Sequence, residues 1–438
     1  MKLVYDIADK PPIKKNLVFA FQQVLAIMAA TLLVPLLVGE PLNQAAALCG
    51  AGFGTLFYIF MTKKKSPVFL GSSFAFISPL IGAASCGCLG IFLGAIFAGL
   101  VYVIIALIIM KTGSAWVNKL LPPVVIGPTV ALIGLSLCSS AVSNLEGTYT
   151  GAEINALIPI FLGLFAFFMT IWASVKGPKW MRMIPFIIGI AAAYIVGLIL
   201  TLLGLPVINL KAFEGIGFFK LPEFVFIGMF EGKGGTIQSF ADVLNIFVLF
   251  APVAFVTLAE HIADHKNLST IVNRDLITDP GLDHTLIGDG VGSIIGSFFG
   301  GCPNTTYGES VGCVAITGNA SVSTIVIAAL YCIVLSFFEP FTAFVNSIPN
   351  CIVGGVCIAL YGFIAVSGLK MVQKVDLGDN RNLFVVAAIL VCGIGGLELN
   401  LGPVTISAIA TALIVGILVN VIFNKRTAEE KAAESTED

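Results

Sequence analysis

Runs of about 20 apolar residues recur along nearly the whole chain, and this repetition limits the folds open to it. About 20 apolar residues are what a helix needs to cross the hydrocarbon core of a bilayer. The 438 residues are 58% hydrophobic and only 11% charged, which is more apolar surface than a soluble core of this length requires. We therefore predict an all-α, polytopic integral membrane protein.

The apolar runs predict about fourteen transmembrane segments. Their approximate bounds are 16–38, 43–62, 66–84, 89–110, 116–141, 153–175, 183–204, 241–263, 285–300, 304–318, 321–338, 344–367, 382–397 and 402–423. The third and tenth segments are short and rich in Gly, Ser and Thr. We expect both to be broken helices that begin with short extended stretches.

Basic residues set the orientation of these segments, because cytoplasmic loops carry an excess of Lys and Arg. With 1–15 placed as a cytoplasmic N-terminus, one side collects the loop residues Lys63, Lys64, Lys65, Lys111, Lys119, Lys176, Lys179, Arg182, Lys266, Arg274, Lys370, Lys374 and Arg381. The opposite side has Lys211, Lys220 and Lys233, all in the loop 205–240. We expect both termini, including the charged tail 425–438, in the cytoplasm.

Two sequence patterns recur about half a chain apart. The G-x-G-x-G pattern at 50–54 returns at 288–292, and the proline–glycine pattern at 122–127 returns at 349–354. If each copy holds an odd number of segments, the second copy enters the membrane in the opposite orientation. Inverted repeats of this kind are typical of secondary transporters, whose sites lie near the bilayer midplane between broken helices.

Two acidic residues, Glu260 and Glu309, interrupt apolar segments of the chain. A carboxylate at membrane depth costs a few kcal/mol, so it marks a substrate or ion site by default. Glu309 stands beside the second broken segment. Half-helix ends at such a break present backbone N–H groups that bind carbonyl oxygens of a small ligand. Gly/Ser helix packing explains either broken segment alone, and Glu309 tips the balance toward a ligand site.

Asp264 follows Glu260 by one helical turn, so the two acids share a face of the predicted helix. A protonated carboxyl offers a donor beside an acceptor, which matches the N–H and C=O edge of a pyrimidine or purine. Binding a base would then favour protonation. The alternative places Asp264 at the solvated cytoplasmic end of the helix. We expect His265 and His284 to be solvated, and His261, on another face, to be structural.

Several motifs carry a resemblance to a known family. They are LGSSFAFISP at 70–79, AEH at 259–261, DPGL at 279–282, PNTTYGE at 303–309 and LYG at 360–362. Over nearly its whole length the chain resembles the nucleobase–ascorbate transporter family, also called nucleobase:cation symporter-2. The family signature falls on residues 309–318. Glu at its first position is the pattern of the uracil permeases within the family, whereas Gln goes with xanthine and urate carriers.

The resemblance implies a fourteen-span fold of two inverted seven-span repeats, divided into a core domain and a gate domain. The core would comprise 16–113 and 241–339, and the gate 114–240 and 340–424. Glu260 and Glu309 would hydrogen-bond the base, backbone amides at Phe74 and Gly308 would contact its carbonyls, and Ala30, Tyr307 and Tyr361 would shape the pocket. Glu260, Glu309 and Asp264 would take part in proton coupling.

Three residues depart from the family pattern. Ser310 replaces the Asn of the signature, and Gln22-Gln23 replaces a Gln-His pair that is common in the first span. Asp264 replaces a histidine that some uracil carriers have one turn after the first glutamate. That histidine is associated with proton coupling, so Asp264 is a candidate substitute.

The function implied by the resemblance is import of uracil by proton symport, with an elevator-type movement of the core against a dimeric gate in a bacterial cytoplasmic membrane. A xanthine, urate or other purine carrier is the alternative. A proton is favoured over sodium, and no cofactor, metal or nucleic acid is expected. An anion transporter would want a basic side chain at its site, and a channel would want a repeated filter motif. An enzyme is disfavoured, since we find no zinc motif, nucleophile–base pair or phosphate loop.

Overall fold

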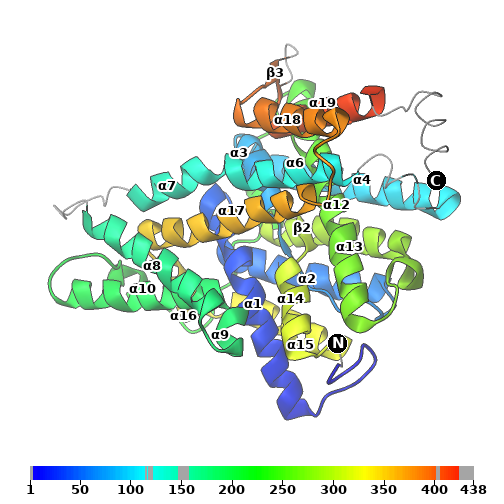
Figure 1. Cartoon of the computed structure of the whole chain (residues 1–438). Coiled ribbons are helices and arrows are strands. Elements are labelled where there is room, and N and C mark those ends of the chain that lie inside the picture. The colour runs from blue at the N-terminus through cyan, green and yellow to red at the C-terminus, as the bar shows by residue number, and fades with distance from the viewer. Residues whose placement is uncertain (1–2, 114–115, 117–121, 147–156, 401–404, 424–438) are drawn as a thin grey trace. The chain divides into compact units, whose positions relative to one another are not determined.

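The computed structural model describes residues 3–113, 116, 122–146, 157–400 and 405–423 (Figure 1). The chain divides into two compact units. The first comprises 1–112 and 138–360, and the second comprises 113–137 and 361–438. The expected tail 425–438 lies outside the described residues.

The first unit contains most of the described helices and both broken segments. Its elements are α1 (Ile13–Val38), α2 (Gln44–Met61), β1 (Leu70–Ser72), the 3₁₀ turn η1 (Phe74–Phe76), α3 (Ile77–Ala84), α4 (Gly87–Thr112), α7 (Cys138–Glu146), α8 (Leu157–Val175), α9 (Lys179–Met183), α10 (Pro185–Leu202), η2 (Leu210–Phe213), α11 (Val225–Glu231), α12 (Phe240–Val272), the π turn η3 (Ile277–Gly281), α13 (Leu282–Gly300), β2 (Asn304–Thr306), α14 (Gly308–Thr317), α15 (Val322–Ser336), α16 (Glu339–Asn346) and the first half of α17 (Asn350–Val372).

The second unit is smaller and combines a short stretch from the first third of the chain, 113–137, with the C-terminal part from 361 onward. Its elements are α6 (Pro123–Ser136), the second half of α17, α18 (Asn380–Ile394), β3 (Leu399–Asn400), β4 (Thr405–Ile406) and α19 (Ala408–Phe423). A Cβ on Gly393 would lie 2.0 Å from Leu132, and one on Gly416 would lie 2.3 Å from Ile389. Small residues thus let α6, α18 and α19 pack closely, as is usual between membrane helices.

The described helices confirm a polytopic membrane protein. Eight of them are long and apolar enough to cross a bilayer: Ile13–Val38, Gln44–Met61, Gly87–Thr112, Pro123–Glu146, Leu157–Val175, Pro185–Leu202, Phe240–Val272 and Asn350–Val372. Shorter apolar helices cover Phe74–Ala84, Val322–Ser336, Asn380–Ile394 and Ala408–Phe423. Both broken segments are present, each with a short strand ahead of a short helix. The count of fourteen spans and the repeat relation stay predictions.

The two G-x-G-x-G patterns lie on helices that pack directly against each other, α2 and α13. A Cβ on Gly50 would lie 2.2 Å from the carbonyl oxygen of Gly296, and one on Gly54 would lie 2.7 Å from that of Gly292. No side chain fits at such separations, so glycine is required for the two backbones to meet. Strand β1 packs on α2 and strand β2 packs on α13, so both strands lie against this helix pair.

The N-terminal segment packs on the far end of α14. Backbone N–H of Val4 donates to the carbonyl oxygen of Gly318, the left-handed residue that ends this helix, at 2.8 Å. Tyr5 forms a parallel bridge with Asn319. Asp6 pairs with Arg274, which follows α12. Residues 4–9 therefore belong to the first unit rather than to a detached tail.

Candidate functional site

Strands β1 and β2 form an antiparallel pair inside the first unit. Their register joins Leu70 to Thr306, Gly71 to Thr305 and Ser72 to Asn304. All six residues are buried. Because the pair is antiparallel, the helices that follow the two strands leave it at opposite ends. Two helical segments from distant parts of the chain thus begin next to one paired stretch of backbone.

Polar side chains from the flanking helices hold each strand in place. The Thr55 hydroxyl on α2 accepts from the N–H of Leu70 at 3.0 Å and donates to its carbonyl oxygen at 3.2 Å. Ser293 on α13 donates to the carbonyl oxygen of Asn304. The Asn304 amide in turn donates to the carbonyl oxygen of Gly50 at 3.2 Å. These bonds satisfy strand groups that would otherwise be unpaired at membrane depth.

The first broken segment continues from β1 into an apolar turn. The N–H of Ser73 donates to the carbonyl oxygen of Pro303 at 3.1 Å, which keeps this end of the strand pair closed. Phe74 then opens η1 and is half-buried. Phe76 is buried and stacks on Phe250 of α12, with ring centroids 5.7 Å apart. The segment therefore presents Phe74 beside the strands while its next turn is fixed to α12.

The second broken segment places Glu309 at the start of α14. Tyr307 is buried, and its hydroxyl donates to the carbonyl oxygen of Ser72 at 2.7 Å. Its ring covers Gly71, whose missing Cβ would lie 2.3 Å from it. Gly308, the first helical residue, is exposed, and Glu309 is half-buried. Tyr307 therefore supports the strands from inside, while Gly308 and Glu309 form the open end of the helix.

Glu260 and Asp264 lie on α12 next to this helix end, as their spacing predicts. The Glu260 side chain is exposed and Asp264 is half-buried. Glu260 precedes Asp264 by one helical turn and so lies on the same face of α12. Asp264 accepts a hydrogen bond from the Thr306 hydroxyl at 3.4 Å. One of its oxygens lies 3.6 Å from the point where a Cβ on Gly308 would sit. The structure therefore brings all three candidate acids to one place.

The remaining candidates fall in two different places. Ala30 lies on α1, is 3% exposed and precedes Thr31, whose hydroxyl contacts that of Tyr307 at 3.4 Å. Ala30 therefore lies next to the residue of α1 that contacts Tyr307. Tyr361 belongs to the second unit, where it is buried in α17. The structure assembles Glu260, Glu309, Asp264, Phe74, Gly308, Tyr307 and Ala30 within the first unit.

The prediction that His265 is solvated is wrong. His265 is fully buried, with its Nε2 2.6 Å from the Tyr58 hydroxyl and its Nδ1 2.8 Å from the carbonyl oxygen of His261. Because Nδ1 must donate to that carbonyl oxygen, Nε2 of the neutral ring is an acceptor, and it lies beside the hydroxyls of Tyr58 and Ser66. His284 is half-buried and pairs with Asp283 at 3.1 Å. The face of α12 that carries His265 is thus covered by Tyr58 of α2 rather than open to water.

A buried acid that sequence reasoning missed lies behind β2. Asp289 on α13 is fully buried, 2.6 Å from Nδ1 of His261, and the backbone amide of Thr306 lies close to it. Nε2 of His261 contacts the Thr285 hydroxyl at 3.0 Å. The criterion that selected Glu260, a charge inside an apolar segment, also applies to Asp289. Asp289 stands between Gly288 and Gly290, however, and the G-x-G-x-G pattern indicates helix packing rather than a binding site.

The arrangement can bind a small planar polar molecule. Glu260 and Asp264 of α12 lie beside the N-terminus of α14, which carries Glu309 and whose first backbone N–H groups have no partner inside the helix. Phe74, half-buried in η1, follows the other strand of the pair. A molecule with alternating N–H and C=O groups could use the carboxyls as acceptors or donors and the helix end as a donor.

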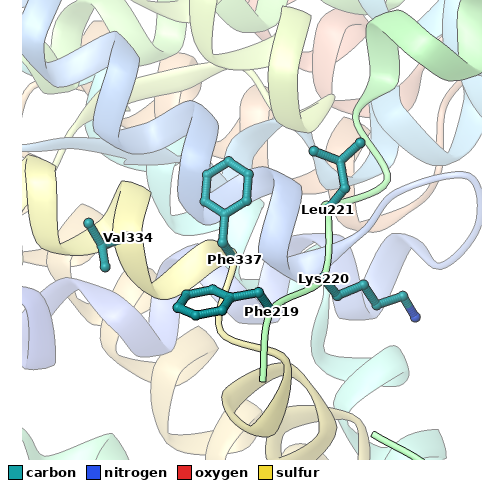
Figure 2. Close-up of a pocket in the computed structure, with 5 residues that line it drawn as sticks. All are labelled: Phe219, Lys220, Leu221, Val334 and Phe337. Atoms are coloured by element: carbon teal, nitrogen blue, oxygen red, sulfur yellow. The ribbon is translucent and has the colours of Figure 1, made fainter. Parts of the chain in front are cut away.

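A hollow of about 380 Å³ lies elsewhere in the first unit (Figure 2). It is lined by Phe219, Lys220, Leu221, Val334 and Phe337, from the loop before α11 and the end of α15. Lys220 also lies 3.8 Å from Glu339. This hollow contains none of the candidate residues, and its lining is almost entirely apolar. It therefore does not provide the polar groups of the candidate site.

A helical membrane protein with two broken segments and carboxyl groups beside them has the architecture of a secondary transporter. Residues 14–402 match the model of a permease family. The chain therefore belongs to this permease family. It is 39% identical to a uracil permease of Bacillus caldolyticus, over 97% of this chain and 96% of the relative. A uracil permease of Escherichia coli strain K12 is 33% identical, over 95% and 93% of the two chains.

Solved structures with a similar fold come from anion transporters. The transmembrane domain of the cyanobacterial bicarbonate transporter BicA superposes with a TM-score of 0.64 at 14% identity, covering 94% of this chain and 98% of that domain. SLC26A9 gives a TM-score of 0.64 at 12% identity, covering 94% of this chain and 66% of that one. At these identities the likeness shows a shared fold and says nothing about the substrate.

Proposed function

We propose that this protein imports uracil across a bacterial cytoplasmic membrane by proton symport. The observation that carries the proposal is the approach of α12 to the open end of α14: Asp264 lies beside Gly308, Glu260 precedes it by one helical turn, and Glu309 follows Gly308. Relatives named as uracil permeases, at 33% to 39% identity over nearly the whole chain, support uracil as the substrate. Glu at the first position of the signature, residue 309, supports the same choice over a purine.

Uracil fits the chemistry of these residues. Each N–H of uracil stands beside a C=O, so one carboxyl group can accept from the N–H and, when protonated, donate to the neighbouring oxygen. The backbone N–H groups at Gly308 and near Phe74 would bind the remaining carbonyl oxygens. Phe74 would pack on the ring, and Tyr307 and Ala30 would set the shape of the pocket.

The coupling to protons follows from the same contacts. A carboxyl that must donate a hydrogen bond to the base binds it only when protonated, so base and proton are taken up together. Glu260, Glu309 and Asp264 are the candidate carriers of this proton. Asp264 takes part through its contact with Thr306, which joins it to β2.

Movement of the substrate follows from the expected domains. The core, 16–113 and 241–339, would carry the base past the gate, 114–240 and 340–424, in an elevator-type movement. The gate would also form a homodimer, and both termini would face the cytoplasm. Relatives named as permeases support transport rather than an enzymatic activity.

The experiment is binding of tritiated uracil to the purified protein, with unlabelled xanthine as competitor, followed by uptake into proteoliposomes under a pH gradient. We expect saturable uracil binding, weak competition by xanthine, and uptake that needs an inward proton gradient. Displacement of uracil by a lower concentration of xanthine would favour the purine alternative. Uptake that follows a sodium gradient instead would overturn the coupling.

Glutamine variants identify the carboxyl that takes up the proton. Glutamine keeps a donor and an acceptor but cannot titrate, so it imitates a protonated glutamate. We expect one of Glu260→Gln and Glu309→Gln to bind uracil with a Kd that no longer depends on pH, and to exchange uracil without net proton-driven uptake. The other variant should lose binding. Parent-like, proton-driven uptake in both variants would exclude these two acids as the coupling groups.

A further inference from the structure

Ser310 joins three elements directly behind Glu309. Its hydroxyl oxygen accepts a hydrogen bond from the backbone N–H of Phe69 at 3.0 Å, immediately ahead of β1. The same oxygen accepts from the side-chain amide of Gln23 on α1. Ser310 is fully buried and Gln23 is 2% exposed. A single oxygen atom thus links α1, the entry to β1 and the first turn of α14.

The sequence presents these two residues as unrelated departures from the family pattern, in spans far apart in the chain. In the structure they contact each other, and each fills a position where the pattern has a different polar residue. Neither can turn toward water, because both are buried. Removing the Ser310 hydroxyl would leave two buried donors, the Gln23 amide and the Phe69 N–H, without their acceptor.

We propose that Gln23 and Ser310 are positioning residues that fix the direction of Glu309 relative to β1. Glu309 and Ser310 are consecutive on a helix of only ten residues. A turn of this helix about its axis would carry Glu309 away from Glu260, and the bonds at Ser310 oppose that turn. The inference rests on the proposed function only in that Glu309 is taken to contact the base.

Two single variants and their combination test the pair. We expect Gln23→Met and Ser310→Ala each to weaken binding of the base by about tenfold, the effect of about one lost buried hydrogen bond. The double variant should bind no more weakly than the worse single variant, because all three remove the same contact. The Kd is measured with the purified full-length protein and with uracil or xanthine, whichever the parent protein binds.

Helix α1, which carries Gln23, makes a second buried amide–hydroxyl contact that provides a matched control. The Thr324 hydroxyl on α15 donates to the side-chain oxygen of Asn16 on α1 at 2.6 Å. Asn16 is 4% exposed and Thr324 is 3% exposed. We expect Asn16→Leu and Thr324→Ala to lower the Tm while leaving the Kd unchanged. A parent Kd in Gln23→Met, or an equal loss of affinity in the control variants, would overturn the proposal.

A measurement without ligand separates this inference from the substrate assignment. A hydrophobic carbodiimide modifies protonated carboxyl groups in membrane proteins, and mass spectrometry locates the product. We expect Glu309 to be labelled several-fold faster in Gln23→Met and Ser310→Ala than in the parent, with labelling of Glu260 unchanged. If the parent binds no nucleobase but this difference appears, the function fails and the positioning role stands. Equal labelling rates of Glu309 in parent and variants would contradict the positioning role.

Discussion

The two broken segments have nearly the same backbone and very different side chains. Each consists of a three-residue strand, a connecting residue or turn, and a short helix, and the strands pair with each other. The segment at 70–84 continues as Phe-Ala-Phe and carries no charge. The segment at 304–317 places a glycine and a glutamate at the start of its helix. Similar geometry therefore supplies an apolar surface on one side and a charge on the other.

The contacts that hold the two segments in place also differ, being apolar for the first and polar for the second. The turn after β1 is held by ring stacking of Phe76 on Phe250. The helix after β2 is held by hydrogen bonds at both ends, through Ser310 near its start and Gly318 at its end. Hydrogen bonds restrict rotation about a helix axis more than apolar contacts do, because they need specific directions. The helix that carries Glu309 is therefore held against rotation by directional contacts, whereas the turn after Phe74 packs through an apolar ring contact.

The largest effect is expected for removal of the charge itself. Glu309→Ala should weaken uracil binding by at least about 100-fold, since a hydrogen bond to a charged or protonated carboxyl contributes about 1.5–3 kcal/mol and its partner on the base would be left unpaired. The measurement is equilibrium binding of tritiated uracil to purified protein whose Tm matches the parent. Binding within threefold of the parent would show that the second broken segment does not supply the main polar contact to the base.

A glycine substitution on α13 tests the support of β2 without changing Glu309. A Cβ on Gly296 would lie 2.0 Å from the Asn304 amide, so Gly296→Ala should push β2 away from α13. We expect a loss of about 1–3 kcal/mol in stability, the usual cost of overpacking, together with weaker uracil binding. Gly312 is the matched control, because a Cβ there would have nothing within 4 Å. Gly312→Ala should keep or raise the Tm, and an equal fall in both variants would contradict this account.

The broken segment that carries Phe74 is expected to contribute less to uracil affinity than the segment that carries Glu309. Phe74→Ala should weaken uracil binding by about tenfold, because an apolar contact in a binding pocket is worth about 1–3 kcal/mol. Phe74→Leu restores most of the apolar volume and should recover most of the affinity. The same binding assay decides the matter. A loss in Phe74→Ala as large as that in Glu309→Ala would remove the distinction between the two segments.

Local sequence patterns predict the elements of this site, but not the contacts between them. Gly, Ser, Thr and Pro mark both broken segments, and a charge in an apolar run marks Glu260 and Glu309. Burial of His265 depends on Tyr58 of another helix, so its position near the end of α12 was misleading. The contact of Gln23 with Ser310 joins residues 287 positions apart. Such pairing is fixed by helix packing, which a single sequence does not specify.

The smallest effects are expected at two exposed ion pairs, one near each segment. Lys65 pairs with Asp279 ahead of β1, and Arg274 pairs with Asp6 beyond the end of α14. Because all four side chains are at least 39% exposed, each pair should contribute less than about 1 kcal/mol and should weaken with added salt. Lys65→Gln and Arg274→Gln should therefore lower the Tm slightly at low salt and leave uracil binding unchanged. A large loss of binding in Arg274→Gln alone would mean that the N-terminal segment, through α14, also controls Glu309, and would extend the asymmetry of the two segments to the surface of the unit.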